Sequence, residues 1–332
     1  MSAHLRDASL LMIPSGYKAS KLYSILPEGG GGDLDFARSS IATRVNESGV
    51  VESVGVNVPR IDYTGGGCGK LLIEPQRTNL YLNSGTLATQ NTTTSATKYA
   101  VSFYGTGTIV FTGTYSGSLV GTGNSDRVTL VFTATAGTLT STTSGTVTNG
   151  QLEASTFPSS YIPTSSTSAT RTQDLSQTTS SGISSAINSE EGVLFVDFDR
   201  LGLDYEDSWI GLYKASDSFS NNIRIVYRKD SILAYFRNSS GYQAIMTYYG
   251  TFTMPRIKVA FKWKVNDFAL WANGVEGAAD TSGTTFNAGE IDTVNLGDYF
   301  TSPNPKFNSK INTFAVFPTA LSDADLAELT TL

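Results

Sequence analysis

The sequence contains a single cysteine, Cys68, and a single histidine, His4, in 332 residues. One cysteine cannot form a disulfide within the chain, and a zinc site needs several cysteine or histidine ligands. A catalytic triad that uses histidine would depend on His4, which lies in an N-terminal stretch of the kind that is usually mobile. Disulfide stapling, zinc chemistry and histidine-based triads are therefore close to excluded.

Basic charge and long apolar runs are also scarce. The chain has 23 Lys and Arg against 29 Asp and Glu, a net charge of −6, and no basic stripe. Binding to nucleic-acid phosphates or to anionic lipid is therefore not expected. The longest early apolar run, 10–13, is too short for a signal peptide or a membrane span. We expect a soluble chain that is made in a cytoplasm and has neither nucleic acid nor membrane as a partner.

Residues 1–77 show no helical periodicity and too few apolar residues for a core of their own. They combine short β-like pieces with two glycine runs, 29–32 and 65–67. The first run reads as turn glycines rather than a phosphate loop, because Asp33 and Asp35 follow it and no Gly-Lys-Ser/Thr does. We expect an extended arm that orders against other domains or subunits and is dispensable for folding of the C-terminal part.

The rest of the chain divides into three segments that all lack clear helices until the C-terminus. Residues 78–163 alternate Thr and Ser with β-branched residues, as in 127–133, which predicts a small jelly-roll sandwich. Residues 164–185 hold 14 Ser or Thr in 22 positions, which indicates a linker. Residues 186–332 carry a series of strands and most of the aromatics, which favours a two-sheet sandwich. The predicted fold class is all-β.

Three local patterns in 186–332 are specific. In 258–264 lysines alternate with mostly apolar residues, so the lysines should face water and the others the core. Asn273-Gly274 predicts a type I′ hairpin turn. Ser322, with Asp325 three residues later, predicts the N-cap of one short terminal helix.

Three sets of stretches carry a resemblance to known proteins: 21–46, 54–63 and 72–80 near the N-terminus, 151–153 and 161–164 in the middle, and 258–261, 270–274 and 320–326 near the C-terminus. The N-terminal set resembles a module of bacteriophage virion proteins that is common among phages of Bacteroidetes hosts, including crAss-like phages. The middle set is similar to the end of the jelly-roll module that follows that module. The C-terminal set is similar to laminin-G and concanavalin-A-like lectin domains.

The resemblance implies a phage virion protein: a head fibre, a tail-fibre component or a capsid decoration. Its arm would anchor it to other virion proteins, and its laminin-G-like domain would bind glycans on the host surface. Relatives of this kind are usually oligomers, so a homotrimer located in the virion is expected. Two alternatives stay open, a purely structural virion protein that binds no glycan and a polysaccharide depolymerase.

Enzyme activity is not expected. Glycosidases with a concanavalin-like fold need two carboxyl groups about 5 Å apart, and their usual Glu-X-Asp-X-(X)-Glu strand does not occur here. The best alternating pair, Asp197 and Asp199, is more simply part of a solvated face.

A glycan site would combine an exposed aromatic ring with polar groups. The best candidates for carbohydrate binding are Trp209 beside an acidic loop, Trp271 beside the Asn273-Gly274 turn, Tyr213 and Asp204. Any one of these aromatic residues is more often a packing residue than a ligand contact, because the cores of β-sandwiches contain many aromatic side chains. Laminin-G domains often hold calcium at a loop rim, so Asp204, Glu206 and Asp207 are a candidate calcium site, although exposed solvating charge is favoured. No cofactor is required.

Overall fold

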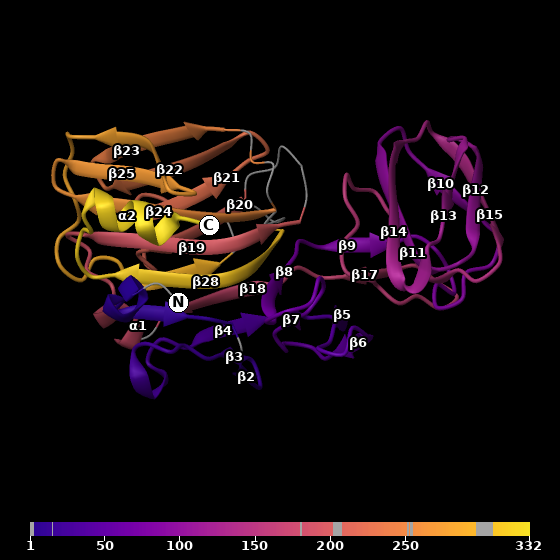
Figure 1. Ribbon diagram of the computed structural model, residues 1–332, viewed down its shortest axis with the longest axis horizontal. Helices are drawn as coiled ribbons and strands as arrows, with labels where there is room; N and C mark the ends of the chain where they lie inside the picture. The colour runs from indigo at the N-terminus through magenta and orange to yellow at the C-terminus, as the bar shows by residue number, and fades with distance from the viewer. Residues whose placement is uncertain are drawn as a thin grey trace.

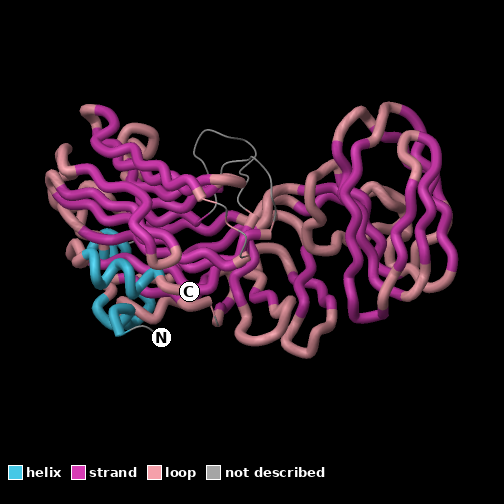
Figure 2. Tube along the Cα trace, turned by 45° about the horizontal axis from the view of Figure 1, so that its top comes forward, coloured by secondary structure: helices cyan, strands magenta, loops and turns pink. Residues whose placement is uncertain are grey.

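The computed structural model describes residues 3–14, 16–179, 181–201, 208–250, 252, 255–296 and 308–332. Strands dominate, and the predicted all-β fold class is confirmed. The chain forms a large lobe and a small lobe, joined where β9 (Arg77–Asn79) pairs with β17 (Ala169–Arg171) (Figures 1 and 2). No described helix is long and apolar enough to cross a membrane.

The large lobe contains two sheets, and the first has eight strands among the described residues. Seven run in the order β26-β25-β24-β19-β28-β8-β7, and β1 pairs with β28. The bounds are β1 (Leu10–Met12), β7 (Ile61–Asp62), β8 (Lys70–Ile73), β19 (Gly192–Arg200), β24 (Arg256–Lys264), β25 (Asp267–Ala272), β26 (Val275–Asp280) and β28 (Ser309–Phe317).

The second sheet has nine strands over the same described ranges, in the order β2-β3-β4-β18-β27-β20-β21-β22-β23. Every pairing with an assigned register is antiparallel. The bounds are β2 (Tyr17–Lys18), β3 (Lys21–Leu22), β4 (Leu34–Ala37), β18 (Leu175–Thr179), β20 (Ser208–Tyr213), β21 (Asn222–Tyr227), β22 (Ser231–Asn238), β23 (Gly241–Tyr249) and β27 (Thr293–Leu296).

The main core lies between these two sheets and follows the two-residue period of the strands. In β24, Ile257, Val259, Phe261 and Trp263 enter it, as the alternation in the sequence predicts. The prediction is wrong for Lys262, whose side chain is on the opposite face of the sheet, as expected, but is buried there rather than exposed. Its ammonium group pairs there with Asp267 and Asp323 (N···O 2.7 and 3.3 Å).

The outer face of the first sheet is covered by the C-terminal helix α2 (Asp323–Thr330) (Figure 1). Leu326 and Leu329 of α2 bury apolar surface against Phe195 and Trp271 of the sheet, with help from the short 3-10 helix η1 (Ala3–Asp7). Ser322 caps α2, since its hydroxyl accepts from the Asp325 backbone N–H at 3.2 Å. The predicted cap is confirmed.

The predicted hairpin turn is also confirmed. Asn273 and Gly274 have φ values of 51° and 83°, the left-handed conformations that a type I′ turn requires. They join β25 to β26. The other short helices are η2 (Glu28–Gly30) and α1 (Ser181–Ala186).

The small lobe is a sandwich with its own core. Its sheets run β10-β15-β12-β13 and β14-β11-β16, and Phe103, Phe111 and Leu152 are buried between them. The bounds are β10 (Gln90–Thr94), β11 (Lys98–Gly105), β12 (Thr108–Gly113), β13 (Gly117–Val120), β14 (Gly123–Thr133), β15 (Gly137–Ser144) and β16 (Thr148–Glu153).

Residues 1–77 are not a separate arm in the structure. Their strands β1 and β8 pair with β28, and β4 pairs with β18, so they extend both sheets of the large lobe. The apolar residues that are too few for a core of their own, such as Leu10, Leu34 and Leu71, are buried in the main core. A further hairpin, β5 (Ala42–Val45) with β6 (Val51–Val54), follows β4.

The stretch 164–185, expected to be a linker, contains β17, β18 and the start of α1. Strand β18 lies inside the second sheet, between β4 and β27. Its Ser and Thr side chains hid this role, because backbone pairing needs no apolar side chain. The large lobe is thus assembled from chain on both sides of the small lobe.

We predict that Leu34→Ala lowers the free energy of unfolding of the full chain by about 2–5 kcal/mol, the usual result of a cavity in a packed core. Ile41→Ala, in the same segment but with a side chain 62% exposed, should change it by less than about 0.5 kcal/mol. Chemical denaturation of both variants measures the difference. Equal stabilities would mean that the N-terminal strands do not contribute to the core.

Candidate functional site

Trp209 belongs to a row of rings and guanidinium groups on the outer face of the second sheet. It lies on β20, Arg224 on β21 and Tyr235 on β22, and Arg224 and Tyr235 are direct cross-strand partners. The Arg224 Cζ lies 4.3 Å from the Trp209 ring centroid and 4.6 Å from that of Tyr235. The two rings are close to parallel, at 13°. Such contacts between a cation and two rings hold all three side chains in place.

The row continues toward β23. Tyr235 and Tyr242 have ring centroids 5.8 Å apart, and Arg224 Nη2 donates to the Tyr242 hydroxyl at 3.2 Å. The Arg237 Cζ lies 5.0 Å from the Tyr242 ring centroid and 4.4 Å from that of Phe219. We call these six residues, Trp209, Phe219, Arg224, Tyr235, Arg237 and Tyr242, the aromatic face.

The aromatic face follows from strand alternation. Arg224 stands between Ile223 and Ile225, and Tyr235 stands between Ala234 and Phe236; these four neighbours are all in the main core. The side chains of Arg224 and Tyr235 therefore point away from the core. Phe219 and Tyr242, at 50% and 46% exposure, are the most open rings of the row.

The other predicted glycan-binding residues do not join Trp209 on this face. Trp271 is on β25 of the first sheet, only 9% exposed and packed in the cluster beneath α2. Tyr213 is 1% exposed, and its ring lies over Gly211, where a Cβ would come within 2.7 Å of it. Asp204 lies outside the described residues.

Glu206 and Asp207 of the predicted calcium site, like Asp204, also lie outside the described residues. Elsewhere in the described part of the chain, no three carboxylate, histidine or cysteine side chains cluster as metal ligands would. The calcium site stays a prediction.

Sequence reasoning missed Phe219, Arg224, Tyr235 and Arg237. A signal was present in β21 and β22, where Arg224, Tyr235 and Arg237 each follow a buried apolar residue in an otherwise largely apolar strand. Reading these two strands as neighbours would have placed Arg224 and Tyr235 on one face. Phe219 has no such signal, because it comes from the turn before β21.

Asp197 and Asp199, the alternating pair on β19, lie together but are neutralised. Arg256 donates to both oxygens of Asp197, at 2.8 and 2.6 Å, and Lys70 pairs with Asp199. The Asn312 amide donates to both carboxylates, at 3.3 and 3.1 Å. The hydrogen bond to Asp197 raises the pKa of Arg256, so its guanidinium stays charged beside that carboxylate. Asp197 is buried rather than part of the solvated face that the sequence suggested.

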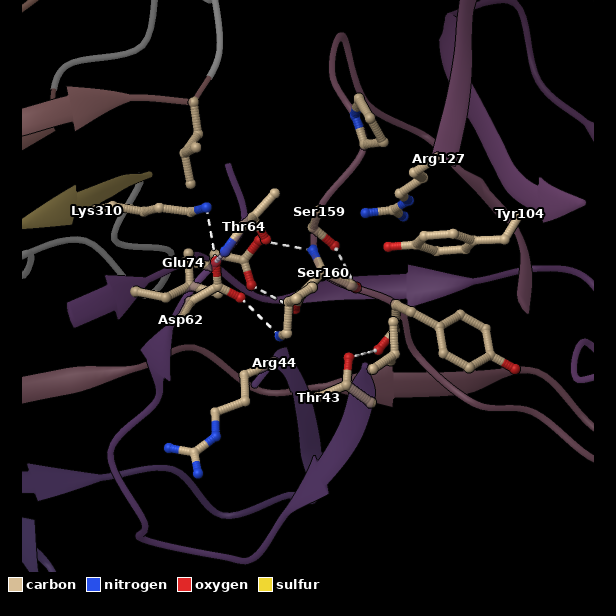
Figure 3. Close-up of a pocket in the computed structure, with 16 residues that line it drawn as sticks. Thr43, Arg44, Asp62, Thr64, Glu74, Tyr104, Arg127, Ser159, Ser160 and Lys310 are labelled. Atoms are coloured by element: carbon tan, nitrogen blue, oxygen red, sulfur yellow. Dashed lines mark hydrogen bonds and ion pairs between the residues drawn. The ribbon is translucent and has the colours of Figure 1, made fainter. Parts of the chain in front are cut away.

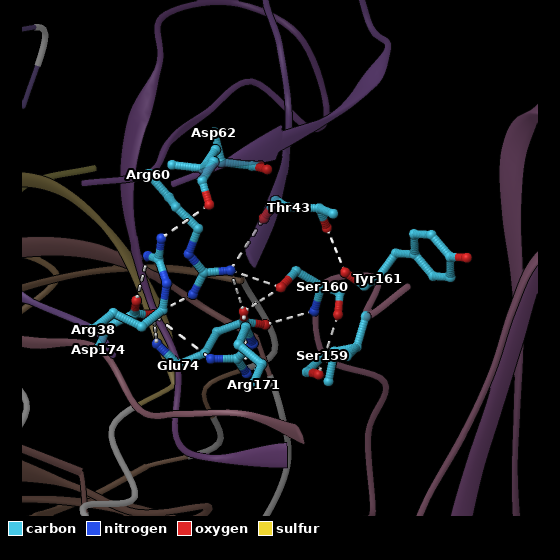
Figure 4. A network of polar contacts seen from close by, with 12 residues as sticks. Arg38, Thr43, Arg60, Asp62, Glu74, Ser159, Ser160, Tyr161, Arg171 and Asp174 are labelled. Carbon is cyan, nitrogen blue, oxygen red and sulfur yellow. Dashed lines mark hydrogen bonds and ion pairs between the residues drawn. The ribbon is translucent and has the colours of Figure 1, made fainter. Parts of the chain in front are cut away.

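A second polar constellation lies where the lobes meet (Figure 4). Arg60 donates to Glu74 at 2.7 Å and pairs with Asp174, which Arg38 also contacts at 3.1 Å. Arg171 pairs with Glu74 at 3.4 Å. All five side chains are buried. We call this group of three guanidinium groups and two carboxylates the junction network.

The junction network sets the charge state of its members. Burial alone would raise the pKa of Glu74, but Arg171 and Arg60, with two hydrogen bonds from Ser160, hold it well below its usual range. Close by, burial raises the pKa of Glu153, despite hydrogen bonds from the Ser159 backbone and hydroxyl at 2.8 and 2.5 Å. Glu74 is therefore a fixed anion.

A cavity of about 160 Å³ lies beside this network, between the lobes (Figure 3). Tyr104 and Arg127 reach it from the small lobe, and Asp62 and Lys310 from the large lobe. Lys310 pairs with Asp62 at 2.7 Å, and Arg127 donates to Ser102 at 2.8 Å. Its walls continue the polar contacts of the junction, so we assign it to the seam between the lobes.

No protein-family model matches the chain, and no curated protein matches it by sequence. Among solved structures, it is similar to the CBM40 domain of a Ruminococcus gnavus IT-sialidase bound to α2,3 sialyllactose. The TM-score is 0.39 and the identity 17%, over 46% of this chain and 88% of that one.

Two other solved structures are similar at the same level. For the leech intramolecular trans-sialidase the TM-score is 0.39 and the sequence identity 18%, over 46% of this chain and 25% of that one. For the binding domain of botulinum neurotoxin DC in complex with rat synaptotagmin II the TM-score is 0.38 and the sequence identity 11%, over 48% of this chain and 40% of that one. Similarity this low assigns neither a family nor a ligand.

We predict that Glu74→Gln lowers the free energy of unfolding by about 3–5 kcal/mol at neutral pH, because it leaves three buried arginines with Asp174 as the one remaining carboxylate of the network. The lowered pKa of Glu74 means that its contribution is present above the ordinary value of 4.5 and is lost as the pH falls below it. The gap between wild type and variant should therefore narrow in acid. Glu190→Gln, at an exposed site, is the control, and a gap independent of pH would contradict the prediction.

Proposed function

We propose that this chain is a non-enzymatic binding protein whose large lobe holds a glycan on the aromatic face. The observation that supports the proposal is the continuous row of rings and guanidinium groups from Trp209 to Phe219. Sugar rings present apolar C–H faces that stack on aromatic rings, and hydroxyl groups that accept from guanidinium N–H donors. The aromatic face offers both kinds of group side by side.

The position of the row favours binding over packing. Rings that only fill a core point between the two sheets, as Phe236 and Trp263 do. Those of the aromatic face point outward, and Phe219 and Tyr242 keep about half of their surface open. Adjoining exposed rings on a sheet face are a common mark of an interaction site.

Absence of catalysis is part of the proposal. The neutralisation of Asp197 and Asp199 supports it, because a retaining glycosidase needs one carboxyl free to donate a proton and one free to attack. A polysaccharide depolymerase is the alternative. A reducing-end assay on host capsule tests it, and release of reducing ends would overturn the non-enzymatic proposal.

We further propose a place in a phage virion, as a fibre or decoration protein that assembles as a homotrimer and adheres to the host. Support comes from the resemblance of the N-terminal stretches to virion modules. A purely structural virion protein without a glycan ligand is the alternative. Light scattering on the full chain at micromolar concentration tests the trimer, and a monomer mass would remove it.

We predict that Trp209→Ala weakens glycan binding about tenfold and changes the melting temperature only slightly, because Trp209 is half-buried on the outer face. Trp271→Ala is the matched control. Trp271 is packed beneath α2, so its loss should lower the free energy of unfolding by about 3–5 kcal/mol and leave the affinity of folded molecules unchanged.

A glycan array identifies the ligand, and titration calorimetry with thermal melts measures both variants. If Trp209→Ala lowers the melting temperature strongly but leaves affinity per folded molecule intact, Trp209 is a packing residue. The aromatic face would then lose its role as the glycan site.

A further inference from the structure

Arg237 differs in its surroundings from the arginines of the chain that pair with carboxylates. Arg38, Arg44, Arg60, Arg171 and Arg256 each pair with a carboxylate. Arg237, on β22 opposite Tyr242, contacts the rings of Phe219 and Tyr242 instead. Within the described part of the chain its guanidinium reaches no hydrogen-bond acceptor, and its Nε is shielded from water without a partner.

A guanidinium held in this way is preorganised to bind an anion. Its contact with two rings fixes the plane of the group. The terminal Nη groups, unlike the shielded Nε, are the donors that an acceptor can reach, so little freedom is lost when one arrives. The N–H fork matches the two oxygens of a carboxylate, and such bidentate bonds are stronger than those to neutral acceptors.

We propose that Arg237 binds the carboxylate of an acidic sugar, such as a uronic acid, while the adjoining rings of Phe219 and Tyr242 contact the sugar ring. This rests on the glycan-binding function proposed above and names the class of glycan. The net charge of −6 and the lack of a basic stripe disfavour highly charged sulfated polymers, which bind through many cations. A single fork favours one carboxylate at short range.

The test uses the full-length protein and a panel of oligosaccharides in matched pairs, each acidic glycan beside the same glycan with its carboxyl groups reduced to alcohols. We expect wild type to bind at least one acidic member and to lose about tenfold or more in affinity for its reduced form. This comparison needs no variant, so it does not depend on whether a mutant folds.

Variants then assign the effect to Arg237. Arg237→Gln should weaken binding of the acidic glycan about tenfold or more and leave the weak binding of the reduced form unchanged. Arg237→Lys should recover little of the loss, because an ammonium keeps the charge but not the fork. Arg6→Gln, at an exposed site remote in sequence, is the matched control and should bind as wild type does. Arg237→Met, which keeps an apolar stem against the rings, replaces the glutamine variant if that one unfolds.

The outcomes distinguish failure of the carboxylate inference from failure of the proposed glycan-binding function. If wild type binds only neutral or only sulfated glycans, the carboxylate inference is overturned and the glycan-binding function stands. If Arg237→Gln weakens acidic and reduced forms equally, Arg237 merely supports the rings and the inference is again overturned. If wild type binds no glycan of the panel or of a broader array, the proposed function itself fails.

Discussion

The arrangement of the chain depends on the junction network of Arg38, Arg60, Glu74, Arg171 and Asp174. Arg38 follows β4, Arg60 precedes β7 and Glu74 follows β8, all before the small lobe in the sequence. Arg171 lies in β17 and Asp174 precedes β18, both after the small lobe. Removing such charges from water is costly unless every partner is present. The network therefore forms only when the segment before the small lobe meets the segment after it.

That constraint explains the architecture. The chain leaves the large lobe through β9 and returns through the paired strand β17, so the small sandwich is an insertion within the larger one. Strands β1, β4 and β8 from before the insertion, and β18 after it, then complete both sheets of the large lobe. The aromatic face is built on the second of these sheets, on strands β20 to β23, which follow the junction in the sequence.

Several residues of the stretches 21–46, 54–63, 72–80 and 151–153 have a physical role at this junction. Arg38, Arg60 and Glu74 belong to the network. In the later stretch Gln151 joins the segment 159–162 by accepting from the Ile162 N–H at 2.6 Å and donating to Ser159 and Ser160 carbonyls. Asn79 likewise binds the backbone of Gly150, Leu152 and Ile162. These stretches therefore join the two lobes, whatever the large lobe binds.

The sequence by itself determined the features that depend on neighbours along the chain: strand alternation in β24, the Asn273-Gly274 turn and the Ser322 cap. It also singled out Trp209. Only the tertiary structure decided which strands pair, because backbone hydrogen bonds between strands form whatever side chains the strands carry. For that reason the Ser- and Thr-rich β18 looked like a linker and 1–77 like a free arm. The same cause hid the aromatic face, since Arg224, Tyr235 and Arg237 become neighbours of Trp209 and Phe219 only through the register of four strands.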